Sequence, residues 1–120
     1  MTITISGDTP SKKNSRKLVP RGNRIMSFPN QTYQRWHKEA MRELMQYRGQ
    51  ADGKVMIDYM FYVKTNRKKD LDNMIASIND LLVDKGLLKD DSWQSLCIGT
   101  ADACIDRDNP RAEITIVELE

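Results

Sequence analysis

The sequence predicts a single α+β domain in which a four-stranded mixed sheet packs against two helices. The expected order is β-α-β-α-β-β, with a flexible basic loop near the N-terminus. The length of 120 residues suits one domain with one modest core. The hydrophobic fraction of 39% and the charged fraction of 30% are typical of a globular protein rather than a disordered chain. Apolar residues recur at helical spacing in two segments, while four other segments have the composition of strands.

The first part of the chain is expected to hold a strand, a loop and a helix. Residues 2–6, TITIS, alternate in polarity as a short strand does. Residues 8–24, DTPSKKNSRKLVPRGNR, are polar, contain prolines and a glycine, and show no apolar period, so we expect a mobile loop. Residues 31–47 predict an amphipathic helix, because apolar residues recur three or four positions apart: Tyr33, Trp36, Ala40, Leu44 and Tyr47.

The middle of the chain is expected to add a long strand and a second helix. Residues 54–64, KVMIDYMFYVK, have the β-branched and aromatic composition of a central strand. Residues 71–85 predict a helix that ends at Gly86, with Asp70 or Asp72 as its N-cap.

The C-terminal segments 93–101 and 112–120 are expected to complete the sheet as two strands. RDNPR, between them, has the composition of a turn. We therefore expect these two strands to form a hairpin.

Composition also narrows the cellular setting and the class of chemistry. No apolar run approaches the roughly 18 residues of a membrane helix, and no signal-peptide layout is present, so we expect a cytoplasmic protein without a membrane partner. Cys97 and Cys104 are then expected as reduced thiols, and with His37 they fall short of a zinc site. The sequence contains no phosphate-binding loop or similar motif, and no organic cofactor is expected.

The net charge of +2 is unevenly distributed along the chain. Residues 10–48 carry ten Lys and Arg against two Glu, a net charge of +8, and residues 70–91 carry six Asp against two Lys, a net charge of −4. This pattern suits a protein that grips a polyanion and holds cations beside it. Attraction between the two halves of the chain explains the same pattern equally well.

The string RKKDLDN, residues 67–73, places three cations next to Asp70 and Asp72, and a second acidic pair, Asp90 and Asp91, follows the predicted helix. Taken singly, these aspartates have the positions of a helix cap and a solvated turn. If the segment after the helix returns along it, three or four of these carboxylates can converge and offer the oxygen ligands that Mg²⁺ prefers. Two such ions can activate a water and stabilise the leaving oxygen in phosphodiester cleavage.

Four features together resemble the RusA family of Holliday junction resolvases, small phage and prophage enzymes: PSKKNSRK, KKDLDN, the helix behind it and GLLKDD. The resemblance spans nearly the whole chain and implies one RusA-like endonuclease domain, residues 1–120. It further implies a homodimer, in a bacterial or phage-infected cell, that binds branched DNA. Such a dimer makes paired symmetric nicks in four-way junctions with Mg²⁺, or with Mn²⁺ in its place.

The resemblance also assigns roles by position. Asp70, Asp72 and Asp91 match the family's catalytic, metal-binding carboxylates. Asp90 matches their acidic neighbour and is expected to join the metal site, and Lys69 matches a catalytic basic residue beside the cluster.

The chain departs from the family pattern at Ala76, where a lysine is common one turn into the second helix. Losing one charge-stabilising donor costs on the order of 100- to 1000-fold in rate. Lys68, Lys69 or Lys89 would have to replace it. The departure leaves junction binding intact and puts the rate of cleavage in question.

Basic residues are expected to bind DNA backbones without reading sequence: Lys12, Lys13, Arg16, Lys17, Arg21, Arg24, Arg67 and Lys68. Two alternatives to a nuclease stay open on the sequence. One is a junction-binding protein that has lost most of its cleavage through Ala76. The other is a non-enzymatic interaction domain, which predicts no preference for branched DNA.

Overall fold

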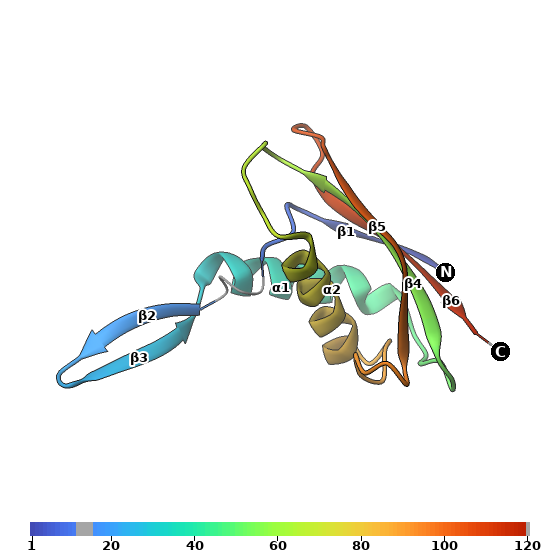
Figure 1. Ribbon diagram of the computed structural model, residues 1–120, viewed down its shortest axis with the longest axis horizontal. Coiled ribbons are helices and arrows are strands. Elements are labelled where there is room, and N and C mark those ends of the chain that lie inside the picture. Colours follow the sequence, from blue (N-terminus) through green and yellow to red (C-terminus); the bar gives the residue numbers. More distant parts are fainter. Residues whose placement is uncertain (12–15, 120) are drawn as a thin grey trace.

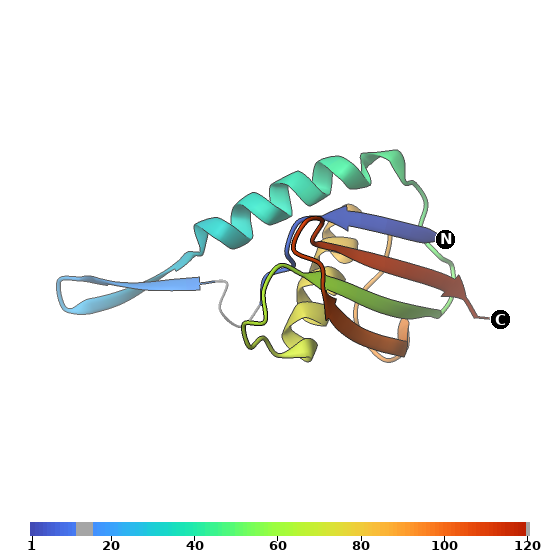
Figure 2. The same ribbon diagram turned by 90° about the horizontal axis from the view of Figure 1, so that it is seen from above.

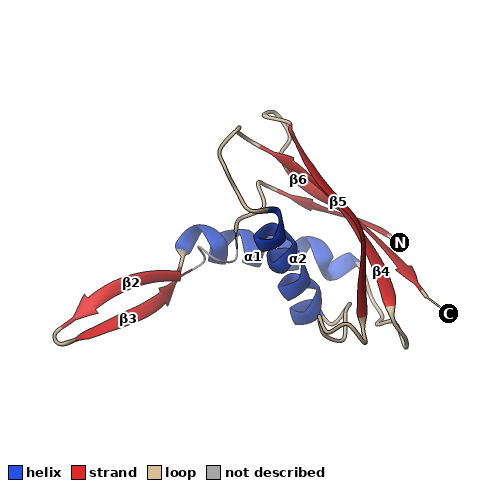
Figure 3. Ribbon diagram, viewed as in Figure 1, coloured by secondary structure: helices blue, strands red, loops and turns tan. Residues whose placement is uncertain are grey.

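A computed structural model gives the structure of the chain and describes residues 1–11 and 16–119. Its main sheet has the order β1-β6-β4-β5, formed by β1 (Thr2–Ser6), β6 (Arg111–Glu118), β4 (Val55–Val63) and β5 (Leu96–Ile105). Two helices, α1 (Gln31–Glu43) and α2 (Leu71–Lys85), lie on one side of this sheet (Figures 1 and 3). A short 3-10 helix, η2 (Leu44–Gln46), continues α1. The predicted class, a mixed four-stranded sheet packed against two helices, is confirmed.

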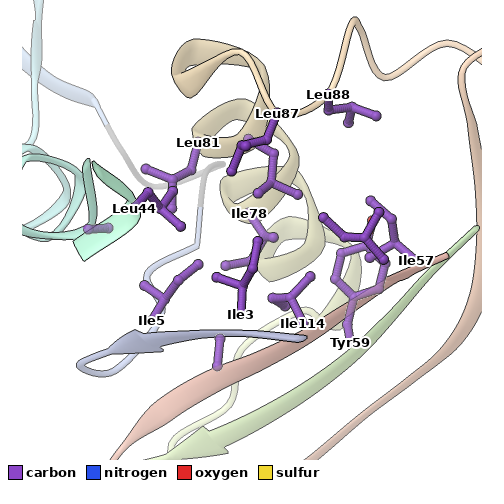
Figure 4. Close-up of a cluster of buried hydrophobic side chains, with 14 of the residues drawn as sticks. Ile3, Ile5, Leu44, Ile57, Tyr59, Ile78, Leu81, Leu87, Leu88 and Ile114 are labelled. Atoms are coloured by element: carbon purple, nitrogen blue, oxygen red, sulfur yellow. The ribbon is translucent and has the colours of Figure 1, made fainter. Parts of the chain in front are cut away.

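The core lies between the sheet and the two helices. Burial alternates along β4, so that Val55, Ile57, Tyr59 and Phe61 face the helices. Ile78 and Leu81 of α2 are fully buried against them, together with side chains of β1 and β6 (Figure 4). Burial of these side chains is the main force that places α2 on the sheet.

A buried polar contact adds a fixed point between α2 and the sheet. The Tyr59 hydroxyl donates to Asn79 Oδ1 at 2.6 Å, and both side chains are buried. Burial raises the pKa of Tyr59 above its usual range, and the charge of Asp91 adds to the effect, so the hydroxyl stays protonated as a donor. Because a buried polar group is costly unless it is paired, this bond favours one position of α2 on the sheet.

The expected hairpin of the last two strands is wrong. β5 and β6 both pair with β4, β5 parallel to it and β6 antiparallel, so β4 lies between them. The turn after β5 crosses the end of β4, where the Asp106 N–H donates to the Val63 carbonyl at 2.9 Å. Burial explains the arrangement: Ala112, Ile114 and Ile116 make β6 an inner strand, while most of β5 is exposed, as suits an edge.

The expectation of an irregular loop before α1 is also wrong in part. Arg16–Arg21 and Arg24–Pro29 form an antiparallel hairpin, β2 and β3, that projects away from the sheet (Figures 1 and 2). Gly22 has a φ of +62° at the turn, a conformation that glycine adopts without strain. Gly22–Asn23 lies between two short apolar stretches, which is a sequence signal of a hairpin. The prediction of a loop gave more weight to the prolines and polar residues around it.

The remaining elements follow the prediction closely. β1 and α2 have the predicted bounds, and the other helix and strands differ from theirs by a few residues. Among the described residues, no helix is long and apolar enough to cross a membrane.

Candidate active site

The acidic string DLDN opens α2. Asp70 occupies the N-cap position with extended backbone angles, φ −76° and ψ 127°, and its carbonyl accepts the first helical bonds. Its carboxylate caps no N–H of the described backbone, and Asn73 Nδ2 donates to Asp70 Oδ2 at 3.3 Å. Asp70 and Asp72 are both exposed. Asp70 therefore occupies the cap position without making the usual cap bond, and the carboxylates of Asp70 and Asp72 are both accessible.

The surroundings of Asp70 and Asp72 are positively charged, so they attract anions to the place where the two carboxylates can bind a cation. The N-terminus of α2 carries the positive end of the helix dipole, which stabilises carboxylates and attracts phosphate. Arg67 and Lys68 are exposed just before the pair. These two predicted DNA-binding cations thus lie on the chain directly beside the predicted metal ligands.

The second acidic pair has a different local role. Asp90 Oδ1 accepts the Ser92 N–H at 2.9 Å and also accepts the Ser92 hydroxyl. These two bonds, with a further one from Ser95, hold the pKa of Asp90 below its ordinary value. Asp90 therefore organises the turn that leads into β5. Asp91, next to it, is exposed.

The structure does not bring the two pairs together. Asp70 and Asp72 lie at the N-terminal end of α2, and Asp90 and Asp91 follow its C-terminal end, across a helix about 22 Å long. No three His, Cys, Asp or Glu side chains of residues 1–11 and 16–119 are placed to hold a metal ion. The assignment of all four aspartates to one metal site stays a prediction.

Lys69, the predicted catalytic cation, is engaged in an ion pair. Its Nζ lies 2.9 Å from Asp8 Oδ2 and donates to the Thr9 carbonyl at 2.8 Å. Its side chain is only 20% exposed. Asp8 was not anticipated from the sequence, where it is one residue of a polar stretch with no motif of its own.

The absent lysine at Ala76 has three candidate replacements, which lie in different settings. Lys89 follows the far end of α2, Lys69 is bonded to Asp8, and Lys68 is exposed two residues before Asp70. Of the three, Lys68 has both the proximity in sequence and the exposure that contact with a phosphate requires.

A groove of about 430 Å³ adjoins this end of α2. It is lined by Asp8, Pro10, Ser11, Asn30, Thr32, Tyr33, Arg67, Lys68 and Lys69. Burial, followed by the charges of Asp80 and Asp84, raises the pKa of Tyr33 to about 12, so its hydroxyl is a donor at neutral pH. Arg67 and Lys68, both exposed, give the groove an anion-binding character, while the charge of Lys69 is paired with Asp8 in the same lining. A second hollow, of about 480 Å³, lies beside Met1 and Val117 and contains none of the predicted site residues.

The predicted DNA-binding residues before α1 are only partly described. Arg24 is exposed at the turn of the β2–β3 hairpin. Arg16, Lys17 and Arg21 lie in its strands, but their side chains are outside the described part of the structure. Lys12 and Lys13 lie outside the described residues.

Comparison with known proteins gives a consistent result. The protein-family model for endodeoxyribonuclease RusA matches residues 8–117. A curated relative, the crossover junction endodeoxyribonuclease RusA of Aquifex aeolicus (strain VF5), is 32% identical over 85 residues. The alignment covers 69% of this chain and 66% of that protein, just under two thirds of its length.

Proposed function

Because the chain belongs to the RusA endodeoxyribonuclease family, we propose that the protein is a structure-selective nuclease that cuts four-way DNA junctions. The strongest support for this proposal comes from the residues at the start of α2. There, two exposed aspartates stand beside two exposed cations, and the carboxylate of the first is not used as a helix cap. This combination supports binding of a phosphodiester and a divalent cation at the same point.

The donor set at Asp70 and Asp72 fits Mg²⁺ or Mn²⁺. Both ions favour oxygen ligands, and Mg²⁺ is commonly held by one or two carboxylates, with water and substrate phosphate as the other ligands. A bound ion would supply an activated water and charge stabilisation at the scissile phosphate. The chain itself contributes the two carboxylates, the positive helix end and the nearby side chains of Arg67 and Lys68.

DNA binding is proposed for the groove beside α2 and for the basic hairpin. The groove offers Arg67 and Lys68 to the backbone, and the hairpin carries further cations well away from the sheet (Figure 2). A two-stranded ribbon is narrow enough to enter the major groove of a duplex arm. Contacts of this kind give affinity without sequence reading and weaken with salt.

A homodimer is proposed because a four-way junction must be cut on two strands related by two-fold symmetry. The position of Asp91 gives a second reason. If Asp91 acts with Asp70 and Asp72, as the family resemblance implies, a site shared between two copies would supply it, since the two groups flank opposite ends of α2 and do not group within the described part of one chain.

A second candidate is a junction-binding protein with little cleavage. Two observations favour it: Ala76 provides no cation, and the cation nearest in sequence to Asp70 is bonded to Asp8. This candidate shares the DNA-binding surface and differs from the first in its rate of cleavage.

The experiment that separates the two uses a synthetic mobile four-way junction and a matched linear duplex, each incubated with the protein in Mg²⁺ and in EDTA. Symmetric nicks on the junction in Mg²⁺ support the nuclease. Tight junction binding without nicks supports the second candidate. Equal binding to both substrates and no nicks in either would refute both.

A further inference from the structure

The Asp8–Lys69 ion pair joins two segments that are far apart in the sequence. Besides its bond to Lys69, Asp8 accepts the Lys64 N–H through Oδ1 at 3.2 Å, so one carboxylate bridges both ends of the loop before α2. Lys69 binds back to the Thr9 carbonyl, which closes the connection from the other side. The Asp8 side chain is 32% exposed and the Lys69 side chain 20% exposed. An ion pair that is partly shielded and cross-bonded in this way is better ordered than an isolated surface pair.

A second contact fixes the same segment further along α2. The Ser77 hydroxyl is fully buried and donates to the Pro10 carbonyl at 2.7 Å. Thr9, between the two anchor points, is 1% exposed. Residues 8–10 therefore lie along the first two turns of α2, the helix that begins with the candidate carboxylates.

This segment also lines the groove beside α2. The groove lining includes Asp8 and Pro10 from this segment together with Lys69. The end of β1 is itself fixed, since the Gly7 N–H donates to the Pro110 carbonyl at 3.0 Å. The position of residues 8–10 along α2 thus sets the shape of this groove, next to Asp70 and Asp72.

We propose that Asp8 is a positioning residue, which acts through Lys69 to hold the groove-lining residues 8–10 in a fixed place beside the carboxylates of α2. DNA bound along the groove then meets Asp70 and Asp72 in one register. This inference rests on the proposed junction cleavage. It also gives Lys69 a different role from contact with the scissile phosphate, because two of its three N–H donors are used within the chain.

The two roles of Lys69 predict opposite effects of Asp8→Asn. If Lys69 binds the scissile phosphate, removing its internal partner releases it, and cleavage is unchanged or faster. If the Asp8–Lys69 pair positions the groove lining, Asp8→Asn slows cleavage just as Lys69→Met does. The double variant then adds nothing, because either substitution alone breaks the pair.

The test is single-turnover cleavage of a mobile junction in Mg²⁺ with protein in excess. Asp8→Asn and Lys69→Met are each expected to slow cleavage by about 10-fold or more, the scale of losing an orienting partner. The double variant is expected to be no slower than the slower single variant, and Lys69→Arg to retain most of the rate. Unchanged or faster cleavage by Asp8→Asn, or multiplied losses in the double variant, would overturn the proposal.

Asp84→Asn is a matched control. It breaks another side-chain contact of α2, between Asp84 Oδ2 and His37 Nε2 at 2.9 Å, at the opposite end of the helix. Its cleavage rate is expected to stay within about twofold of wild type, since exposed pairs contribute little. A loss equal to that of Asp8→Asn would mean that any weakening of α2 slows cleavage, and would overturn the specific role of Asp8.

A measurement without DNA keeps this inference separate from the proposed function. Amide hydrogen exchange of Lys64, whose N–H is bonded to Asp8, should become at least tenfold faster in Asp8→Ala, while the buried strand β6 keeps its protection. If the wild type cuts no junctions but this exchange change occurs, the function fails and the anchoring of the segment stands. An unchanged Lys64 amide would overturn the anchoring itself.

Discussion

The acidic pair at the start of α2 and the acidic pair after its end differ in how far their carboxylates are bonded within the chain. Asp70 occupies a cap position without capping a described N–H, and Asp72 is exposed. Asp90 is held by Ser92, and Asp91 is exposed beside it. The two acidic pairs look alike in the sequence, but their carboxylates differ in the hydrogen bonds that they already accept within the chain. A metal site needs carboxylates that are not already used, and the first pair meets that condition best.

The two lysines before Asp70 show the same contrast at closer range. Lys68 is exposed, whereas Lys69 is bonded to Asp8 and to a backbone carbonyl. One cation is available to an incoming phosphate and its neighbour organises the chain. Residue type and spacing did not distinguish these roles, because the partner of Lys69 lies about sixty positions away in the sequence.

The largest expected effect comes from removing a carboxylate of the first pair. Asp70→Asn should reduce junction cleavage by more than about 100-fold, because loss of an outer-shell partner alone costs about 10- to 100-fold. Junction binding should be equal or tighter, since one charge that repels phosphate is gone. Denaturing and native gels on the same samples measure both quantities. Normal cleavage by Asp70→Asn would show that the carboxylate site is elsewhere.

The separation of the two pairs makes a prediction about subunits. Asp70→Asn and Asp91→Asn are each expected to be inactive, but dimers that contain one subunit of each should recover nicking. One of their two sites would then combine intact Asp70, Asp72 and Asp91 from different chains. Because about half of randomly mixed dimers are hybrids and each has one working site, recovery of about a quarter of wild-type activity is expected.

Purified hybrids, selected with two different affinity tags, provide the decisive sample. Recovery only in the hybrids supports a site shared between subunits. Hybrids that stay inactive would place the action of Asp91 within its own chain or remove it from the site.

A smaller effect is expected at Ala76, between the two pairs. Ala76→Lys restores the cation that the family commonly has and should speed single-turnover cleavage by about 10-fold or more, given the 100- to 1000-fold range for one charge-stabilising donor. Ala76→Met controls for the added side-chain length. A rate unchanged by the lysine would indicate that another cation, for which Lys68 is the best placed, already serves this function.

Much of the fold was predictable because local patterns agree with the tertiary structure. The spacing of Leu71, Ile78 and Leu82 predicts a helix with one buried face, and the bounds 71–85 are confirmed. Pairing of β5 with β4 instead of β6 was not predictable in this way. This pairing depends on which strands lie inside the sheet and are hydrogen-bonded along both edges. That is a property of the assembled sheet and not of the turn that joins two strands.

The candidate site was predictable as a set of residues and not as an arrangement. The DLDN string indicated where carboxylates meet a helix start, and the structure has that helix start. Whether the chain returns along α2 after Gly86 is decided by packing of Leu87 and Leu88 into the core, which holds the segment at the far end of the helix. The bond between Asp8 and Lys69 likewise forms only once β1 and α2 are in place.

The smallest expected effect concerns stability and distinguishes the two members of the second pair. The bonds from Ser92 depress the pKa of Asp90 in the folded state below the ordinary value of 3.8, so the ionised form stabilises the fold. This contribution is present above the unfolded-state pKa and is lost as the pH falls through the lower folded-state value. Asp90→Asn should therefore be less stable than wild type near pH 7, with a difference that shrinks once the pH drops below about 3.8. Urea unfolding across this range measures it, with Asp91→Asn as a control that removes the same charge but keeps the turn. A gap between wild type and Asp90→Asn that stays constant down to the lowest pH would show that the turn depends on the shape of the side chain and not on its charge.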